Sequence, residues 1–449
     1  KCLPDLLRPH GYRSAYFQAA IPSFENRTQL VRNMGFDEFT SGDDMPSEGL
    51  KKSNYFGYED KQLIAPIARW LEDAKEKGGP FVLAVLTNQP HHDYAPVKTY
   101  GFTHYVPDAM QNRYLNAIHY DDVVLKELFA HFTRLGLVED TLFVVLGDHG
   151  EGFGEHGRYA HDDTIYEEGL SIPMLVLDAG GPHAPGRRAG LYNELDVVPT
   201  VFDLLGLRVQ SGSYVGRSIF EDGPPRVLYA ACYNDAKCLA RFEGTRKYIH
   251  HFERQKDELF DLAADPDERH NLAGKSRGEL DALRAEVVEW YELTRAMYSE
   301  VAARVASRYV TKERPDVQFE KSVTFGDSVQ FLGYSLEDDE APRGGRFIVT
   351  WHFRVLKPLP DGVRMFIHGY DGKRRHVWGH IPVERLYPEE KWKPGEYVSD
   401  PQPIRIPRNF RADKLVIRGG FWKPRGSRLP TAPEAKDDAP VLAEIPVAR

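Results

Sequence analysis

Residues 141–150, TLFVVLGDHG, form a strand-length run of apolar and β-branched side chains that leads directly into Gly-Asp-His-Gly. Two other short runs, residues 81–86 (FVLAVL) and 173–177 (PMLVL), have the same composition. Strands that are apolar on both faces are typical of a sheet covered by helices on both sides. The three runs therefore predict a central, mostly parallel sheet.

A helix is expected between the first two strands, because apolar residues recur there at helical spacing and stop at Gly136, a residue typical of a helix C-cap. Strand, helix and strand together make a βαβ unit. The predicted fold class is therefore α/β, with the sheet flanked by helices. A second helical pattern covers residues 278–308.

The sequence changes character after residue 308. Residues 309–316 have the composition of a polar linker, and from residue 317 apolar residues such as Phe347, Val349 and Trp351 alternate with more polar ones. A two-residue period broken by turn signals predicts an all-β sandwich over residues 317–449. The last dozen or so residues are rich in Pro and Ala, and we expect them to form a loosely held tail.

Aromatic side chains are frequent in the predicted sandwich. They suit either of two roles: a face that stacks on sugars, or core and strand-surface packing, which we favour because aromatic residues are intrinsically suited to strands. The residues are Trp351, His352, His368, Trp378, His380, Trp392 and Trp422.

Composition limits the classes of partner. A formal net charge of −9 argues against nucleic acid, because proteins that bind a phosphate backbone gather Lys and Arg. No apolar run approaches the roughly 20 residues that span a bilayer, so we expect a link to a membrane only through a segment upstream of Lys1. Of the three cysteines, Cys232 and Cys238 could pair across a short loop, although unpaired buried cysteine is the commoner state.

Asp148 and His149 carry the most informative chemistry. They follow an apolar strand, and in open α/β sheets the carboxyl ends of strands are where ligands gather. A carboxylate oxygen beside an imidazole nitrogen is an ordinary ligand pair for a divalent transition metal. The alternative is a simple turn, with Asp148 as a helix cap and His149 on the surface.

The wider context favours the metal site. Residues 147–157 (GDHGEGFGEHG) and 159–176 (YAHDDTIYEEGLSIPMLV) resemble the sulfatase and alkaline-phosphatase superfamily at nearly every marked position. Further stretches agree in order over about residues 1–300. They are residues 7–17 (LRPHGYRSAYF), 86–94 (LTNQPHHDY), 196–207 (DVVPTVFDLLGL) with 215–220 (VGRSIF), and 258–272 (ELFDLAADPDERHNL).

The resemblance implies roles for four residues. Asp148 and His149 would be metal ligands. His91 stands where the family keeps a histidine that faces the transferring group, and an imidazole with a pKa near neutrality suits a general acid there. His161 stands where phosphoethanolamine transferases carry a histidine that contacts phosphate or a second metal. The alternatives are a loop histidine without a role at 91, with His92 the weaker candidate, and a surface histidine at 161.

Residues 23–27 (SFENR) and 35–39 (GFDEF) resemble lipoteichoic acid synthases and their phosphoglycerol-transferase relatives. The resemblance implies that Arg27 binds the substrate phosphate, which a guanidinium can do through two hydrogen bonds. An exposed structural arginine is the alternative. Gln18 departs from the pattern, since those synthases usually have histidine there.

The nucleophile of this superfamily is a metal-bound Ser, Thr or formylglycine, and we find no match for it. Cys2-Leu3-Pro4 begins like the formylglycine motif Cys-x-Pro-x-Arg, but Leu6 occupies the arginine position. We therefore expect the nucleophile and the first acidic metal ligand upstream of Lys1, and an incomplete metal site in residues 1–449.

These observations predict an enzyme that cleaves or transfers a sulfate or phosphate ester through a metal-activated nucleophile. Residues 1–308 would be its sulfatase-like catalytic domain. We favour Mn or Zn as the metal, with Ca or Mg as alternatives, and expect a glycan or lipid head group to carry the ester. The expected location is the cell envelope, on the periplasmic or extracytoplasmic side. The alternatives are a phosphoglycerol or phosphoethanolamine transferase acting on envelope lipid or glycan, and a non-catalytic relative that binds a glycan.

Overall fold

The computed structural model describes residues 1–449 apart from residues 1, 23, 98–99, 162–163, 209–215, 233–237, 253–254, 276, 338–339, 373, 379–381, 384–386, 408–409, 424–425 and 449. The chain forms two compact units, Lys1–Leu293 and Thr294–Arg449. The division falls inside the long helix α7 (Arg277–Ala306). Each unit is described separately below.

A three-stranded parallel sheet with strand order β2-β1-β3 lies in the first unit. Its strands are β1 (Arg13–Gln18), β2 (Glu38–Thr40) and β3 (Phe81–Leu86). The neighbouring helices are α1 (Leu3–Leu7), α2 (Arg27–Asn33), α3 (Ile64–Lys77) and α4 (Ala109–Leu135). The predicted α/β class is therefore confirmed.

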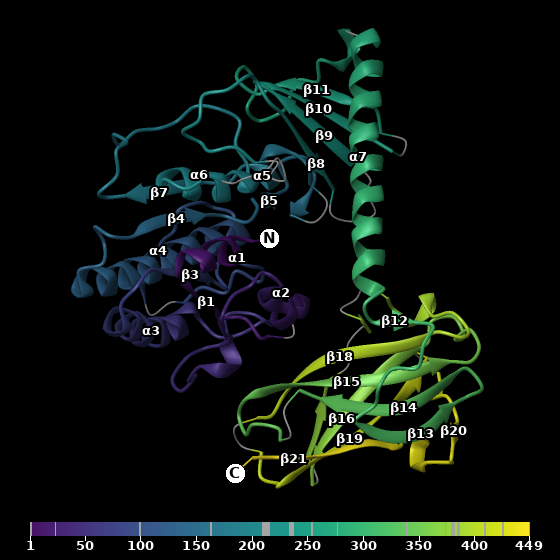
Figure 1. Ribbon diagram of the computed structural model, residues 1–449. Helices are drawn as coiled ribbons and strands as arrows, with labels where there is room; N and C mark the ends of the chain where they lie inside the picture. Colours follow the sequence, from purple (N-terminus) through teal and green to yellow (C-terminus); the bar gives the residue numbers. More distant parts are fainter. Residues whose placement is uncertain are drawn as a thin grey trace. The chain divides into compact units, whose positions relative to one another are not determined.

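Helices α3 and α4 pack against this sheet through their apolar faces (Figure 1). The shared core contains Phe17, Ile67, Trp70, Leu71, Tyr120, Val124 and Leu128. Asp108 caps the start of α4 by accepting hydrogen bonds from the Met110 and Gln111 amides. Gly136 ends the helix in the left-handed region, with φ of +66°, as its position in the sequence predicted.

The strand that precedes Asp148 differs from expectation in its pairing. β4 (Leu142–Leu146) pairs with β7 (Met174–Asp178), and the two strands are antiparallel. Neither belongs to the sheet that contains β3, so the two strands of the predicted βαβ unit lie in separate hydrogen-bonded sheets. Apolar composition indicates burial on both faces, but it does not fix strand direction, which depends on how the connection returns.

Short elements follow β4 and lead to a second, antiparallel sheet. They are β5 (Gly152–Phe153), β6 (Tyr159–Ala160), α5 (Glu167–Leu170) and α6 (Val197–Leu204). The sheet has the order β11-β10-β9-β8. Its strands are β8 (Val227–Ala231), β9 (Cys238–Glu243), β10 (Arg246–His251) and β11 (Glu258–Asp261). Helix α7 packs on this sheet through Val287.

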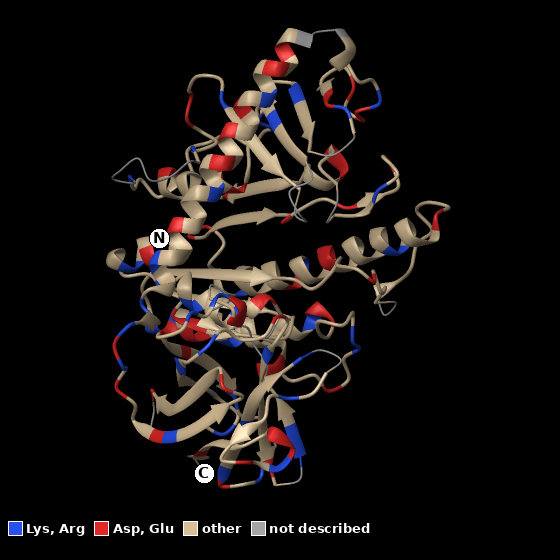
Figure 2. Cartoon of the chain, turned by 90° about the vertical axis from the view of Figure 1, so that its right-hand side faces the viewer, with Lys and Arg blue, Asp and Glu red and all other residues tan. Residues whose placement is uncertain are grey.

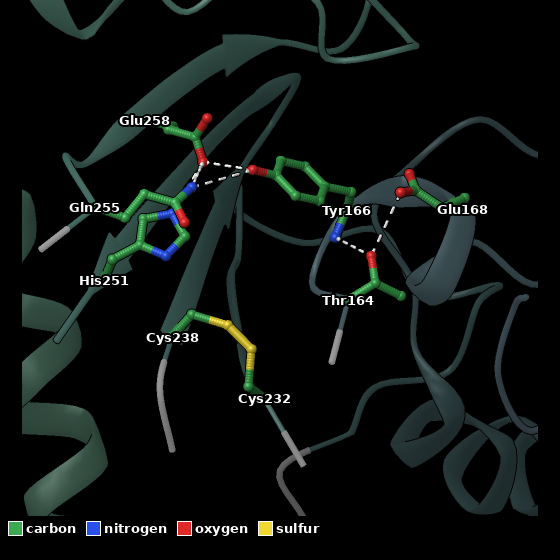
Figure 3. The surroundings of a disulfide bond; sticks show 8 residues. All are labelled: Thr164, Tyr166, Glu168, Cys232, Cys238, His251, Gln255 and Glu258. Carbon is green, nitrogen blue, oxygen red and sulfur yellow. Dashed lines mark hydrogen bonds and ion pairs between the residues drawn. A yellow bond between two sulfur atoms is a disulfide. The ribbon is translucent and has the colours of Figure 1, made fainter. Parts of the chain in front are cut away.

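A disulfide joins Cys232 and Cys238 at the end of this sheet (Figure 3). The pairing is the state that the sequence left as the rarer alternative. Both cysteines pack with Tyr166, Ile249 and Phe260 in a small apolar cluster. The disulfide therefore lies in the core that supports the segment after His161.

The second unit is a sandwich of two antiparallel sheets. One has the order β12-β18-β15-β14-β13-β20 and the other β17-β16-β19-β21. The strands are β12 (Val310–Thr311), β13 (Phe319–Phe325), β14 (Val329–Leu336), β15 (Arg346–Val355), β16 (Arg364–Asp371), β17 (Arg374–Val377), β18 (Tyr397–Arg405), β19 (Lys414–Trp422), β20 (Thr431–Ala432) and β21 (Val441–Pro446). β12 lies within residues 309–316, which were expected to form a linker.

The expectation of a loosely held C-terminal tail is wrong. β21 pairs with β19, and its Leu442, Ala443 and Ile445 side chains are buried in the sandwich core. Pro and Ala suggested disorder, but the alternation of apolar residues over 442–447 was the stronger signal.

Most of the sandwich aromatics have the packing role that we favoured. Trp351, His352 and Trp392 are buried, Trp378 packs against the core, and Trp422 is exposed. His380 lies outside the described residues. Within the described part of the chain, no helix has the length and apolar character needed to cross a membrane.

Candidate active site

Asp148 and His149 lie just beyond the carboxyl end of β4, where the sequence predicted them. Asp148 is exposed and His149 is half-buried. The His149 Nδ1–H donates to the Gly150 carbonyl oxygen over 2.8 Å, which leaves Nε2 with its lone pair. That Nε2 lies 3.6 Å from Asp148 Oδ1. A backbone hydrogen bond at one ring nitrogen is the usual way to fix a metal-binding histidine.

His161 lies against His149, although the two are separated by the β5–β6 hairpin. Their rings stack with centroids 3.8 Å apart. His161 Nδ1 lies 3.2 Å from a carboxylate oxygen of Glu151, whose side chain is only 4% exposed. The carboxylate fixes the orientation of the His161 ring.

His91 completes a row of three histidines. Its ring centroid lies 6.0 Å from that of His161 and 4.6 Å from that of Phe56. The His91 Nδ1–H donates to the His92 carbonyl oxygen over 2.9 Å, so Nε2 remains available for proton exchange. His92 instead lies beside Asp93, with both side chains more than half exposed.

A buried carboxylate holds the loop that carries His91. Asp60 accepts hydrogen bonds from the backbone amides of Asn88 (2.5 Å) and Gln89 (2.9 Å). Burial raises the pKa of Asp60, and the charge of the nearby Asp121 raises it further. No local sequence pattern predicts this support, because a whole helix and a strand separate Asp60 from the loop.

Arg27 begins α2 and is largely buried, with a side-chain exposure of 15%. It pairs with Glu25 at 2.8 Å, while its buried Nε has no hydrogen-bond partner among the residues that the structure describes. Burial raises the pKa of Tyr16, the positive charge of Arg27 lowers it, and the charge of Asp148 raises it. Tyr16 therefore lies within electrostatic reach of both Arg27 and Asp148.

Two acidic residues of this region were not singled out from the sequence. Glu151 stands within the GDHGEG run, so its signal was present. Glu194 precedes α6, and its pKa is raised by burial and by the charge of Asp148, while His149 lowers it. Its proximity to the Asp148–His149 pair depends on how the chain returns from β7.

The tyrosines Tyr94 and Tyr114 form an aromatic group with Phe153 beside Glu151. Burial raises the pKa of Tyr94, and the charge of Glu151 adds to that rise. Tyr114 responds in the same way to burial and to Glu151. Aromatic rings around a carboxylate exclude water and strengthen its hold on His161.

The segment after His161 is anchored to the second sheet. The Tyr166 hydroxyl donates to Glu258 over 2.7 Å, beside the disulfide, as Figure 3 shows. The Glu167 amide donates to Glu268 over 2.6 Å, and the fully buried Lys247 pairs with Glu268 at 2.7 Å. Residues 258–272, recognised from the sequence as a signature, therefore contribute anchoring carboxylates and not reacting groups.

A divalent metal is the cofactor that this donor set would suit. His149 Nε2 and Asp148 Oδ1 offer one nitrogen and one oxygen, which is two of the four or more donors that such an ion requires. Over the described residues, no group of three or more His, Cys, Asp or Glu side chains is arranged to hold an ion. The residues present fit part of a metal site.

Comparison with known proteins shows which proteins this chain is similar to. Residues 1–207 match the family model described as Sulfatase. Choline-sulfatase of Rhizobium meliloti (strain 1021) is 32% identical over 177 residues, which cover 37% of this chain and 34% of that protein. Lipoteichoic acid synthase 1 of Bacillus subtilis (strain 168) is 26% identical over 240 residues, covering 49% and 35%. The chain thus spans about a third of the length of these curated relatives.

The crystal structure of the lipoteichoic acid synthase LtaP from Listeria monocytogenes has a similar fold. Its TM-score is 0.50 at 21% sequence identity, and the match covers 63% of this chain and 72% of that chain. At this level of identity, the likeness shows a shared fold. Residues 1–207 match the Sulfatase family model and the curated relatives include a sulfatase and lipoteichoic acid synthases, which confirms the resemblance drawn from the motifs.

Proposed function

We propose that the chain forms part of a metal-dependent enzyme that cleaves or transfers a sulfate or phosphate ester. Residues 1–308 would be the catalytic domain and residues 317–449 an accessory sandwich. The observation that carries this proposal is the row of His91, His161 and His149 beside Asp148, with ring separations of 6.0 and 3.8 Å. The packing of the fold does not require three histidines from two loops to lie together at the end of a strand.

Asp148 and His149 would hold the metal. When bound, the ion would supply Lewis acidity and neutralise the charge that develops on the ester oxygens. An Asp–His donor pair favours Mn or Zn over Ca or Mg, because imidazole is a poor ligand for the harder cations. The Gly150 carbonyl keeps His149 in the tautomer that presents Nε2.

His91 would handle the proton of the leaving group. Its Nδ1–H is held by the His92 carbonyl, so the ring presents Nε2 to the space next to His161. An imidazolium at that place can protonate a departing alkoxide, and the neutral imidazole can accept the proton of an incoming hydroxyl. The loop hydrogen-bonded to Asp60 fixes the ring in position.

His161 and Arg27 would bind the ester oxygens. The Glu151 carboxylate orients His161 through Nδ1, and the His161 ring lies between those of His149 and His91. The buried and unpartnered Nε of Arg27 is a donor ready for an anionic oxygen. The resemblance of these two positions to those of phosphoethanolamine and phosphoglycerol transferases favours a phosphate ester, while the match to choline-sulfatase favours sulfate.

The nucleophile would come from a segment outside these 449 residues. This part of the proposal is supported by β3 and β4, two apolar strands in which every residue remains partly exposed. β3 ends one sheet, and β4 has a pairing partner only on its β7 side among the described strands. A further strand along these free edges would bury both and bring a residue to the same strand ends.

An extracytoplasmic location in the cell envelope fits this function. The Cys232–Cys238 disulfide favours an oxidising compartment. Several relatives are lipoteichoic acid synthases of bacteria. The substrate would accordingly be an ester on an envelope glycan or lipid head group.

The test compares an aryl sulfate with an aryl phosphodiester, using the full-length gene product loaded with Mn or Zn. We expect turnover of at least one ester, its loss with EDTA, and a fall of roughly 100-fold or more in Asp148→Asn and His149→Ala. Residues 1–449 alone should bind metal sub-stoichiometrically and turn over neither ester. Tight stoichiometric metal with turnover in residues 1–449 would contradict the external nucleophile. A folded full-length product that is inactive on both esters would point to the non-catalytic, glycan-binding alternative.

A further inference from the structure

A hollow of about 390 Å³ lies on the outer face of the six-stranded sheet of the sandwich. The polar and charged residues around it are Arg314, Glu320, Lys321, Ser322, Gln330, Arg354 and Tyr397. Its volume is within the range of small-molecule binding sites. All of these residues belong to the second unit, whereas the three histidines belong to the first.

The strand register builds one side of the hollow. Gln330 lies directly opposite Arg354, and Arg354 lies directly opposite Tyr397, on three adjacent strands. The residues on either side of Arg354, Phe353 and Val355, are buried in the core, so Arg354 points outward. Cross-strand neighbours lie about 5 Å apart, which places an amide, a guanidinium and a phenol ring in one row.

An irregularity in β13 builds the other side. The register of β13 against β14 shifts between Glu320 and Val323, and that of β14 against β15 shifts at Leu332. In a regular strand, only one of two consecutive side chains faces outward. Here Lys321 and Ser322 are both exposed, because the bulge turns the extra residue outward. The Gln330 side chain donates to Ser322 over 3.0 Å, which joins the two sides.

The hollow is lined by three cationic side chains and one carboxylate, in a chain of negative net charge. Arg314 is paired with Glu320 at 2.6 Å. Lys321 and Arg354 make no ion pair with any residue that the structure describes; the contact of Arg354 is with the Tyr397 ring, 5.8 Å from its centroid. Elsewhere, Lys and Arg are scattered among Asp and Glu, and the formal net charge is −9 (Figure 2).

We propose that this hollow binds a sugar or polyol unit that carries a sulfate or phosphate ester. Lys321 and Arg354 would receive the anionic ester, because a guanidinium and an ammonium on two sides match an oxyanion. Ser322 and Gln330 would hydrogen-bond to hydroxyl groups, and the half-buried Tyr397 ring offers a face for the carbon skeleton. The inference rests on the proposed function only for the identity of the ester as sulfate or phosphate. The positive charge of the hollow is enough to favour an anionic ligand.

Binding is measured by calorimetry on residues 1–449, in the Asp148→Asn background with EDTA present, so that the histidine site cannot contribute through metal. The probes are a monosulfated disaccharide, a short glycerol phosphate oligomer and the unsulfated disaccharide. Arg354→Ala and Lys321→Ala are compared with Arg364→Ala, an exposed cation on β16 of the opposite sheet. Thermal unfolding of each variant checks that it remains folded.

We expect saturable binding of at least one anionic probe, weaker binding of the unsulfated disaccharide, and an affinity that falls with salt. Each of the two pocket variants should weaken binding roughly tenfold, and Arg364→Ala should not. Preference for the sulfated or for the phosphate probe identifies the source of the ester. The proposal is overturned if no anionic probe binds, or if folded Arg354→Ala and Lys321→Ala bind as the parent does. If the full-length protein is inactive on both esters but still shows this binding, the proposal for the hollow holds while the proposed function fails.

Discussion

The imidazole rings of His149 and His161 stack with their centroids 3.8 Å apart and their planes inclined by 26°. His149 directly follows β4, while His161 follows the short β5–β6 hairpin, so the hairpin folds the chain back on itself. Neither ring can rotate without displacing the other. The pair therefore depends on what holds each ring, namely the Gly150 carbonyl and the Glu151 carboxylate.

Glu151→Gln should lower kcat by roughly 10- to 100-fold with little change in metal affinity. The amide keeps the volume of the side chain, but it removes the charge that orients His161. The measurement is kcat and metal content of the full-length product, with exposed Glu139→Gln as the control. Metal loss as large as the loss of kcat would mean that Glu151 is itself a ligand.

Arg27→Lys should raise KM for the preferred ester roughly tenfold, because lysine keeps the charge but loses the planar set of donors. Arg27→Ala should raise KM further. Steady-state kinetics with an aryl phosphodiester measure this effect, and Arg69→Ala, an exposed arginine of α3, is the matched control. An unchanged KM in both Arg27 variants would assign this residue to structure alone.

Stability should fall as pH rises from about 4 to 7, because of Asp121. Burial raises its pKa from 3.8 to about 7, and its buried Oδ1 has no hydrogen-bond partner among the described residues. In this window the folded state binds the proton more tightly than the unfolded chain does, so deprotonation on raising the pH favours unfolding. Above pH 7 the contribution of the protonated carboxyl is lost.

Urea unfolding at several pH values checks this dependence. The free energy of unfolding of the wild type, relative to Asp121→Asn, should decrease across that window. The control variant Asp140→Asn, at an exposed position, should show the same decrease of the free energy of unfolding with pH as the wild type does. A wild type and an Asp121→Asn variant with parallel pH profiles would show that Asp121 does not titrate in this range.

The Cys232→Ser, Cys238→Ser double variant should lose about 2 kcal/mol of stability, the value expected for closing so short a loop. Activity should fall as well, because the cysteines pack against Tyr166 in the segment that anchors His161. Thermal unfolding with and without a reductant measures the first effect. Cys2→Ser, which removes the free cysteine, should change neither property.

Local sequence patterns were sufficient to predict the helices and strands and half of the candidate active site. The apolar runs predicted β3, β4 and β7, the helical period with Gly136 predicted α4, and the two-residue period predicted the sandwich strands. Glycines and a polar pair after an apolar strand placed Asp148 and His149 at a strand end. These features depend on side chains within a few residues of one another, so the sequence alone determines them.

Tertiary structure decided the remaining features, because those features depend on contacts between distant segments. Strand direction is set by the return of the chain, so β7 is antiparallel to β4 despite its composition. β21 is a strand because it pairs with the edge of β19. The same holds for the site: His91 reaches His161 across about 70 residues, and Glu194 reaches Asp148 only when the chain is folded. The sequence named the histidines, but packing alone brought them into one row.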